Sequence, residues 1–283
     1  MNYRHIFHAG NFADLLKHAV LTALLADMTR GRAPLTVIDT HAGAGLYDVG
    51  GDLARRTGEG TAAGVLMADA AAPTAFDALK AAVRRANETG VRFYPGSPAL
   101  VAAALRDRDQ LIACEIQRED YERLRHVLKP AGAFAVREDG WEVVRRRTPR
   151  APVPTLVLID PPYEARDDGA RAVEAMRQVV GRNPGAVVAV WAPIKDLTTF
   201  DSLIGGLEEA ARGRDLLVVE ARLRPLHDPM RLNGCAMVVA NPPPGLEAAA
   251  GIAAAWIAGA FGEAGAVGRA SLAGRSSPAR TRK

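Results

Sequence analysis

The sequence predicts an α/β fold built on a doubly wound, mostly parallel sheet of seven strands, with a small inserted helical subdomain. Two observations predict this class. Short apolar runs rich in valine, leucine and isoleucine alternate with longer stretches in which apolar residues recur at helical spacing. The runs carry almost no charge in their interior, as strands do when helices cover both faces of a parallel sheet.

Asn11 and Asp14 are the expected caps of the first helix, because apolar residues recur on one helical face directly after them. No helical pattern separates the last two strands, so we expect them to pair antiparallel at one edge of the sheet. The predicted strands are 35–39, 111–115, 134–137, 155–160, 186–191, 216–220 and 235–240, and the later helices are 118–128, 168–182 and 196–212.

The spacing of two motifs indicates an insertion after the first strand. In nucleotide-binding α/β units, an acid that binds ribose hydroxyls lies roughly 20 residues beyond the glycine turn. Here the corresponding acid, Glu115, follows Gly45 by about 70 residues. Helical patterns at 61–71 and 74–88 indicate a helical lid or docking subdomain in between. The expected division is an N-terminal part at 1–46, the inserted subdomain at 47–92, the rest of the main domain at 93–261 and a basic, disordered tail at 262–283.

Composition excludes several other classes of protein. Of 283 residues, 48% are hydrophobic and 24% charged, which is typical of a globular chain and unlike a disordered or collagenous one. The two cysteines, Cys114 and Cys235, lie within apolar runs, which excludes a disulfide scaffold and a four-cysteine zinc site. We find neither a signal-peptide pattern nor an apolar stretch of the roughly 18 residues that a membrane span needs, so we expect a cytoplasmic protein.

The strongest sign of function is the run Asp160-Pro161-Pro162-Tyr163, which follows a buried strand. Two prolines cannot continue a helix or a central strand, so they fix a rigid turn at the strand's carboxyl end, where open α/β sheets bind ligands. There Tyr163 can stack against a flat ring, while Asp160 and the Pro161 carbonyl accept hydrogen bonds from an amino group such as that of adenine. The alternative is an ordinary Asp-Pro turn with a surface tyrosine.

Two further turns carry candidate ligand contacts. In the run DTHAGAG at 39–45, Gly43 and Gly45 let the backbone pass close to a ligand and adopt a positive φ. The turn lacks the G-x-G-x-x-G spacing and the Lys-Ser/Thr pair, which argues against a dinucleotide site and against a P-loop. After the third strand, Asp139 suits the amino group of a bound adenine moiety, or it caps the helix that begins near Trp141.

The N-terminal run 3–11 combines two aromatics, an arginine and two histidines, which is unusual for a free terminus. It folds over a ligand, contacts RNA, or packs its aromatics under the first strand. Its histidines lack metal-ligand spacing, so no metal site is expected. Arginines cluster at 145–147 and elsewhere, and the net charge is +4. These clusters fit contacts with nucleic acid and solvated helix faces equally well.

Together, these motifs resemble the class I S-adenosylmethionine-dependent methyltransferases that modify amino nitrogens of bases. More narrowly, the chain resembles the RlmJ family, adenine-N6 methyltransferases that act on 23S ribosomal RNA, from its first residues to about Pro243. Residues around Glu115 depart from the family's usual string, although the acid is kept. The matching strings are YRHIFHAGN at 3–11, KH at 17–18, DTHAGAG at 39–45, RTGE at 56–59, YPGSP at 94–98 and DPPYE at 160–164.

The resemblance implies a Rossmann-like methyltransferase sheet, S-adenosylmethionine as cofactor, and 23S rRNA as partner, either protein-free or in an early assembly intermediate. No membrane and no obligate protein partner is expected. Asp160, Pro161 and Tyr163 are the expected catalytic residues, with Asp160 as proton acceptor, and Tyr3, Arg4 and Tyr163 are the expected RNA contacts. The expected cofactor-binding residues are Lys17, His18, His41, Gly43, Gly45, Ser97, Glu115, Asp139, Gly140 and Asp160.

An adenine amino group cannot be reached while its base is stacked and paired, so the expected mechanism is base flipping followed by in-line methyl transfer. Two alternatives stay open. DNA adenine or cytosine amino-methyltransferases share the Asp-Pro-Pro-Tyr motif, and a non-catalytic RNA-binding protein could have the same fold.

Overall fold

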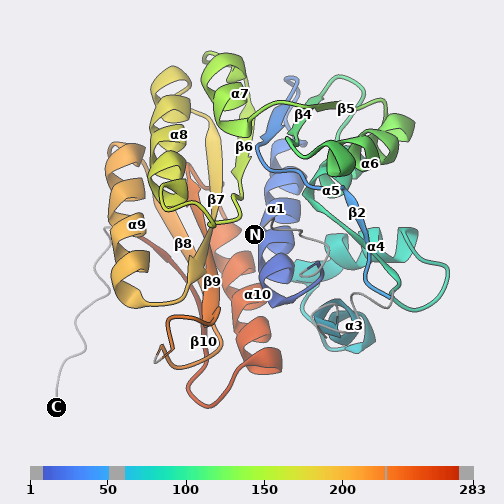
Figure 1. Ribbon diagram of the computed structural model, residues 1–283, viewed down its shortest axis with the longest axis vertical. Coiled ribbons are helices and arrows are strands. Elements are labelled where there is room, and N and C mark those ends of the chain that lie inside the picture. The colour runs from blue at the N-terminus through green and yellow to red at the C-terminus, as the bar shows by residue number, and fades with distance from the viewer. Residues whose placement is uncertain (1–8, 51–60, 227, 274–283) are drawn as a thin grey trace.

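The computed structural model describes residues 9–50, 61–226 and 228–273, and it shows a sheet with helices on both faces (Figure 1). All seven predicted strands are present, and an eighth, which the sequence pattern does not predict, lies at one edge. In order across the sheet the strands are β10 (Val267–Leu272), β8 (Leu216–Arg222), β9 (Gly234–Ala240), β7 (Val187–Ile194), β6 (Thr155–Ile159), β1 (Thr36–Asp39), β4 (Gln110–Cys114) and β5 (Phe134–Val136).

The two faces of the sheet carry separate hydrophobic cores, because successive side chains of a strand point to opposite faces. Within β1, Val37 packs in one core and Ile38 in the other. The first core includes α1 (Phe12–Met28), α5 (Ser97–Ala104), α6 (Arg118–Leu128) and α10 (Leu246–Phe261), and the second includes α7 (Gly140–Arg147), α8 (Asp168–Arg182) and α9 (Leu197–Ala211). In the described part of the chain, the helices are all too short or too polar to span a membrane.

The strands from β7 to β5 run parallel, whereas β9 pairs antiparallel with both β7 and β8. The predicted antiparallel pair is therefore present, but it does not lie at the edge, because β10 pairs with β8 beyond it. The prediction of a disordered tail at 262–283 is wrong for residues 267–272. This strand alternates exposed and half-buried residues and packs closely on α10, where a Cβ on Gly268 would lie 2.0 Å from the Ala254 carbonyl oxygen. It thus needs no run of large apolar residues.

The segment between the neighbouring strands β1 and β4 contains the insertion that the motif spacing predicts. Within this segment, residues 46–48 and 93–95 form a separate two-stranded antiparallel sheet. Phe76 and Tyr94 from this segment are fully buried in the core that also contains α1. Its role as a lid or docking subdomain stays a prediction. The elements before α5 are β2 (Leu46–Asp48), α3 (Thr61–Ala68), the 3-10 helix η2 (Thr74–Phe76), α4 (Asp77–Arg85) and β3 (Phe93–Pro95).

Candidate active site

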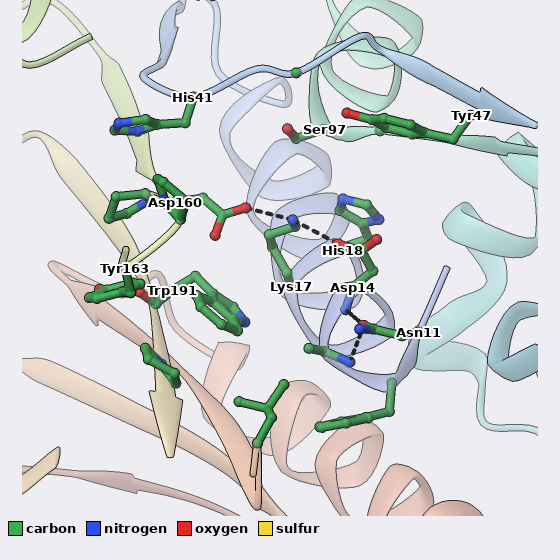
Figure 2. A pocket seen from close by; sticks show the side chains of 18 of the residues that line it. Asn11, Asp14, Lys17, His18, His41, Tyr47, Ser97, Asp160, Tyr163 and Trp191 are labelled. Atoms are coloured by element: carbon green, nitrogen blue, oxygen red, sulfur yellow. Dashed lines mark hydrogen bonds and ion pairs between the residues drawn. The ribbon is translucent and has the colours of Figure 1, made fainter. Parts of the chain in front are cut away.

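A cavity of about 820 Å³ opens where β1, β4, β6 and β7 reach their carboxyl ends, and α1 forms its opposite wall (Figure 2). Its size is typical of sites for small molecules and cofactors. The arrangement follows from the parallel sheet, because parallel strands deliver the residues that follow them to the same edge. The predicted site residues that line it are Lys17, His18, His41, Gly43, Ser97, Glu115, Asp160, Pro161 and Tyr163.

Lys17 connects α1 to the turn after β6. Its Nζ lies 2.6 Å from Asp160 Oδ2 and 2.8 Å from Asp14 Oδ1, and its side chain is 5% exposed. Burial opposes the charge, but the two carboxylates outweigh it and hold the pKa of Lys17 well above its ordinary value. Figure 2 shows Lys17 reaching from the helix toward Asp160. The carboxylate of Asp160 is therefore held in one position inside the cavity.

The first turn of α1 explains why Lys17 points this way. Asn11 Oδ1 accepts hydrogen bonds from the backbone N–H groups of Ala13 and Asp14, at 2.9 and 3.1 Å. Asp14 Oδ2 accepts one from Gly10 N at 2.9 Å. The predicted cap at Asn11 is confirmed, whereas Asp14 lies inside the helix, in its first turn. Residues three apart share one face of a helix, so the capped turn places Asp14 beside Lys17.

Tyr163 is held in a defined orientation by Trp191. Its φ of +53° is a left-handed conformation that non-glycine residues seldom adopt. Its hydroxyl donates to the Trp191 carbonyl oxygen at 2.6 Å, and the two rings lie 5.7 Å apart at 55°. Burial and then nearby Asp160 raise the pKa of Tyr163, so the hydroxyl stays protonated and remains a donor. With its hydroxyl engaged, Tyr163 has its ring available for contact with a ligand.

The turn after β1 is shaped by a tyrosine hydroxyl. Gly43 has a φ of +62°, and a Cβ there would lie 2.1 Å from Tyr47 Oη. That oxygen also accepts a hydrogen bond from Ala44 N at 3.1 Å. Backbone N–H groups of Gly43 and Gln117 donate to the two oxygens of Glu115, at 3.0 and 2.6 Å. Burial raises the pKa of Glu115, whose carboxylate is thus fixed by the backbone at the end of β4.

Two buried polar pairs support this wall. Ser97 Oγ donates to Asp39 Oδ2 at 2.7 Å, and burial raises the pKa of Asp39 to about 6 in spite of that hydrogen bond. His18 Nδ1 lies 2.8 Å from Tyr94 Oη, with the two rings stacked 5.5 Å apart. Ser97 and His18 line the cavity, whereas Asp39 and Tyr94 lie behind them and hold them in place.

His41 lies in the turn after β1, and its ring packs edge-to-face with the ring of Trp141 in α7, with the centroids 4.8 Å apart. Burial lowers the pKa of His41 to about 4, so its imidazole is neutral at pH 7. Asp139 accepts a hydrogen bond from Trp141 N at 2.9 Å and pairs with Arg171 at 3.1 Å. The interpretation of Asp139 as a helix cap is therefore confirmed.

Not every predicted cofactor residue faces the cavity. Gly45, Asp139 and Gly140 do not line it, and their contact with a cofactor stays a prediction. Packing alone requires Gly140, because a Cβ there would lie 2.0 Å from the Thr40 carbonyl oxygen. The predicted RNA contacts at positions 3 and 4 lie outside the described residues.

Several residues that line the cavity were not predicted as site residues, among them Tyr47, Trp191 and Met230. Trp191 is the last residue of the predicted strand 186–191, so the same carboxyl-end rule that identifies Asp160 also points to it. The glycine turn after β1 brings Tyr47 to the cavity, and the loop between β8 and β9 brings Met230 there. No motif in the sequence around either residue indicates a place in the site.

The cavity combines two kinds of lining. Glu115, Gly43 and Ser97 offer polar groups, and a fixed carboxylate at this place suits a pair of ribose hydroxyls. A second part of the lining is apolar and suits a flat base. Among the described residues, no group of three or more His, Cys, Asp or Glu side chains is arranged to hold a metal. The large apolar side chains are Phe12, Ile116, Trp191, Leu223, Met230, Leu232 and Phe261.

Comparison with known sequences points in one direction. A family model described as "Ribosomal RNA large subunit methyltransferase D, RlmJ" matches residues 32–273. The chain is 34% identical over 252 residues to "Ribosomal RNA large subunit methyltransferase J" of Escherichia coli K12, covering 87% of this chain and 89% of that one. It is 33% identical over 251 residues to the protein of the same name from Haemophilus influenzae, with the same coverage.

Comparison with solved structures supports the fold. A crystal structure of a protein from Legionella pneumophila strain Philadelphia 1 aligns with a TM-score of 0.85 and 24% sequence identity. The alignment covers 95% of this chain and 99% of that one. At this sequence identity the likeness shows the fold alone.

Proposed function

Because the chain belongs to the RlmJ family of ribosomal RNA large subunit methyltransferases, we propose that this methyltransferase modifies the N6 nitrogen of a single adenine of 23S rRNA, adenine 2030, using S-adenosylmethionine. One observation carries the proposal. The carboxylate of Asp160, fixed by Lys17 at 2.6 Å, lines the same cavity as the ring of Tyr163, on a proline-stiffened turn.

The polar lining fits the proposed cofactor. Glu115 would accept hydrogen bonds from its ribose hydroxyls, because backbone donors already fix both carboxylate oxygens in place. The turn at Gly43 brings backbone close to the same part of the cavity. The neutral ring of His41 and the hydroxyl of Ser97 add polar groups without adding charge. When bound, S-adenosylmethionine supplies an electrophilic methyl group on a sulfonium.

The residues after β6 would hold the base. Tyr163 would stack on the adenine ring, since its hydroxyl is engaged by Trp191. Asp160 and the Pro161 carbonyl would accept hydrogen bonds from the amino group, and Asp160 would take the proton released as nitrogen gains the methyl group. The ion pair with Lys17 holds this carboxylate in one orientation. Rate acceleration would therefore come mainly from positioning.

The partner we propose is 23S rRNA that is protein-free or in an early assembly intermediate. A cavity that must enclose an adenine cannot accept it from within a duplex, so the base has to leave its stack. Ribosomal proteins and tertiary contacts in a finished subunit would oppose that movement.

The first test is methyl transfer by purified protein to deproteinised 23S rRNA from a strain that lacks this protein, read by mass spectrometry. We expect one new N6-methyladenine. Asp160→Ala should abolish transfer, and Asp160→Asn should reduce it strongly, while calorimetry shows unchanged affinity for S-adenosylmethionine.

The same experiment separates the alternatives. Transfer to duplex DNA in preference to rRNA would identify a DNA amino-methyltransferase. RNA binding without any affinity for S-adenosylmethionine would identify a non-catalytic RNA-binding protein. Full activity in Asp160→Ala would show that the carboxylate is not the proton acceptor.

A further inference from the structure

The loop between β8 and β9, described at residues 223–226 and 228–233, lines one rim of the cavity, and the proposed methyl transfer gives its residues no chemical role. Met230 lies on this rim and is 88% exposed, more than any other large hydrophobic side chain among the described residues. Single exposed apolar residues are common on protein surfaces. Whether the exposure of Met230 indicates a function therefore depends on where it lies and on how its loop is held.

The loop is braced so that Met230 is presented outward. Asn233 Nδ2 donates to the carbonyl oxygens of Lys195 and Asp228, at 2.8 and 2.7 Å. Asn233 N donates to the Ile194 carbonyl oxygen at 3.0 Å. At the tip, Asp228 Oδ1 accepts a hydrogen bond from Met230 N at 2.9 Å. The backbone under Met230 is thus held by polar contacts, and the side chain contributes little to holding it.

Two basic residues belong to this loop or adjoin it. Arg231 follows Met230 in the chain, and the backbone carbonyl of Lys195 accepts a hydrogen bond from Asn233 of the loop. Both are exposed, and neither forms an ion pair with another described residue. Arg224, in contrast, is bound to Glu263 at 3.1 Å and to the Leu232 carbonyl oxygen at 3.1 Å.

An exposed apolar side chain on a loop that carries Arg231 and adjoins Lys195 matches a ligand with stacked rings and a negatively charged backbone. That combination is the chemistry of a nucleic-acid strand. A protein partner of ordinary interface size would need a broader apolar patch than one methionine.

We propose that Met230 enters the base stack of the RNA at the place that the target adenosine leaves, while Arg231 and Lys195 bind the flanking phosphates. This proposal rests on the proposed function, because it concerns how the RNA presents its adenine. A base that leaves the stack exposes its two neighbours, and an inserted apolar side chain restores part of the lost contact. The phosphate contacts hold the strand in register with the cavity.

The test uses two RNAs with the same target sequence: a hairpin fragment of 23S rRNA in which the adenine is stacked, and a single-stranded oligonucleotide. Met230→Ala should lower the rate of hairpin methylation about tenfold more than the rate of oligonucleotide methylation, relative to the wild type. With 2-aminopurine at the target position of the hairpin, fluorescence should rise on binding the wild type but not Met230→Ala. Met230→Leu keeps the apolar bulk and should restore both signals.

Ile252→Ala is the matched control, since Ile252 is an exposed apolar residue of α10 that does not line the cavity. It should leave both RNAs unaffected. If Met230→Ala and the wild type methylate the hairpin at the same rate, the proposed insertion of Met230 into the base stack is wrong. An equal loss of methylation rate on both RNAs would also contradict it. If the wild type methylates neither RNA, the proposed function is wrong, and so is the proposed insertion of Met230, which rests on it.

The proposed phosphate contacts are tested separately, by measuring how RNA binding depends on salt concentration. The double variant Lys195→Glu/Arg231→Glu should bind both RNAs more weakly. The slope of the logarithm of the binding constant against the logarithm of the salt concentration should fall by the amount expected for roughly two phosphate contacts. An unchanged salt dependence would overturn the assignment of these two cations. Arg177→Glu on α8 is the control, because Arg177 pairs with Glu174 and lies outside the cavity lining.

Discussion

Among single residues, Lys17 is the buried cation that joins Asp14 on α1 to Asp160 after β6. Lys17→Met should lower kcat by about a hundredfold, since Asp160 loses the partner that fixes its position. It should also cost about 3 kcal/mol of stability, because two carboxylates remain without their cation. Methylation assays and urea unfolding measure the two effects.

The double variant Lys17→Met/Asp14→Asn separates positioning from folding. It removes one of the two uncompensated carboxylates and should regain part of the lost stability while kcat stays low. Recovery of kcat together with stability would mean that Lys17 supports only the fold.

The raised pKa of Asp39 implies that the free energy of unfolding depends on pH. Its pKa in the folded chain is raised from 3.8 to about 6 by burial, so protonation favours the folded state. The associated stabilisation is present below about pH 4 and is lost as the pH rises through 6, by about 3 kcal/mol in total. Asp39→Asn keeps an acceptor for Ser97 but does not titrate. Urea unfolding should therefore show a smaller loss between pH 4 and pH 7 in this variant, and an equal loss would refute the shift.

Among the elements, the turn between β1 and β2 depends on the fit between a glycine and a tyrosine. Gly43→Ala would place a Cβ 2.1 Å from Tyr47 Oη. It should destabilise the chain by about 2–3 kcal/mol through this clash and the positive φ. Tyr47→Phe removes the oxygen but also the acceptor for Ala44 N. The double variant should be more stable than the sum of the two single effects predicts, as a double-mutant cycle can show. Strict additivity would mean that the clash is relieved elsewhere.

Over the whole molecule, the sequence predicts best what is encoded locally. The seven strands with continuous apolar runs, and the cap at Asn11, are all found. β10 is not predicted, because its burial depends on α10 and β8 and not on its own composition. The pair Lys17–Asp160 joins residues 143 positions apart, and only the packing of α1 against the sheet brings them together. The motif strings identify such residues as members of a site but not as partners of one another.

The cavity is built by α1 and by the ends of four strands, so only the folded chain can bind a ligand in it. S-adenosylmethionine at a hundred times its Kd should therefore stabilise the protein by about 2.7 kcal/mol. For a chain of this size that corresponds to a rise in Tm of roughly 5–10 °C. Asp160→Asn should keep the whole rise, since Asp160 is assigned to the base. Glu115→Gln, which loses the charge proposed to bind ribose hydroxyls, should bind about tenfold more weakly and show about half of the rise. The opposite pattern in a thermal-shift assay would mean that the roles of the two carboxylates are exchanged.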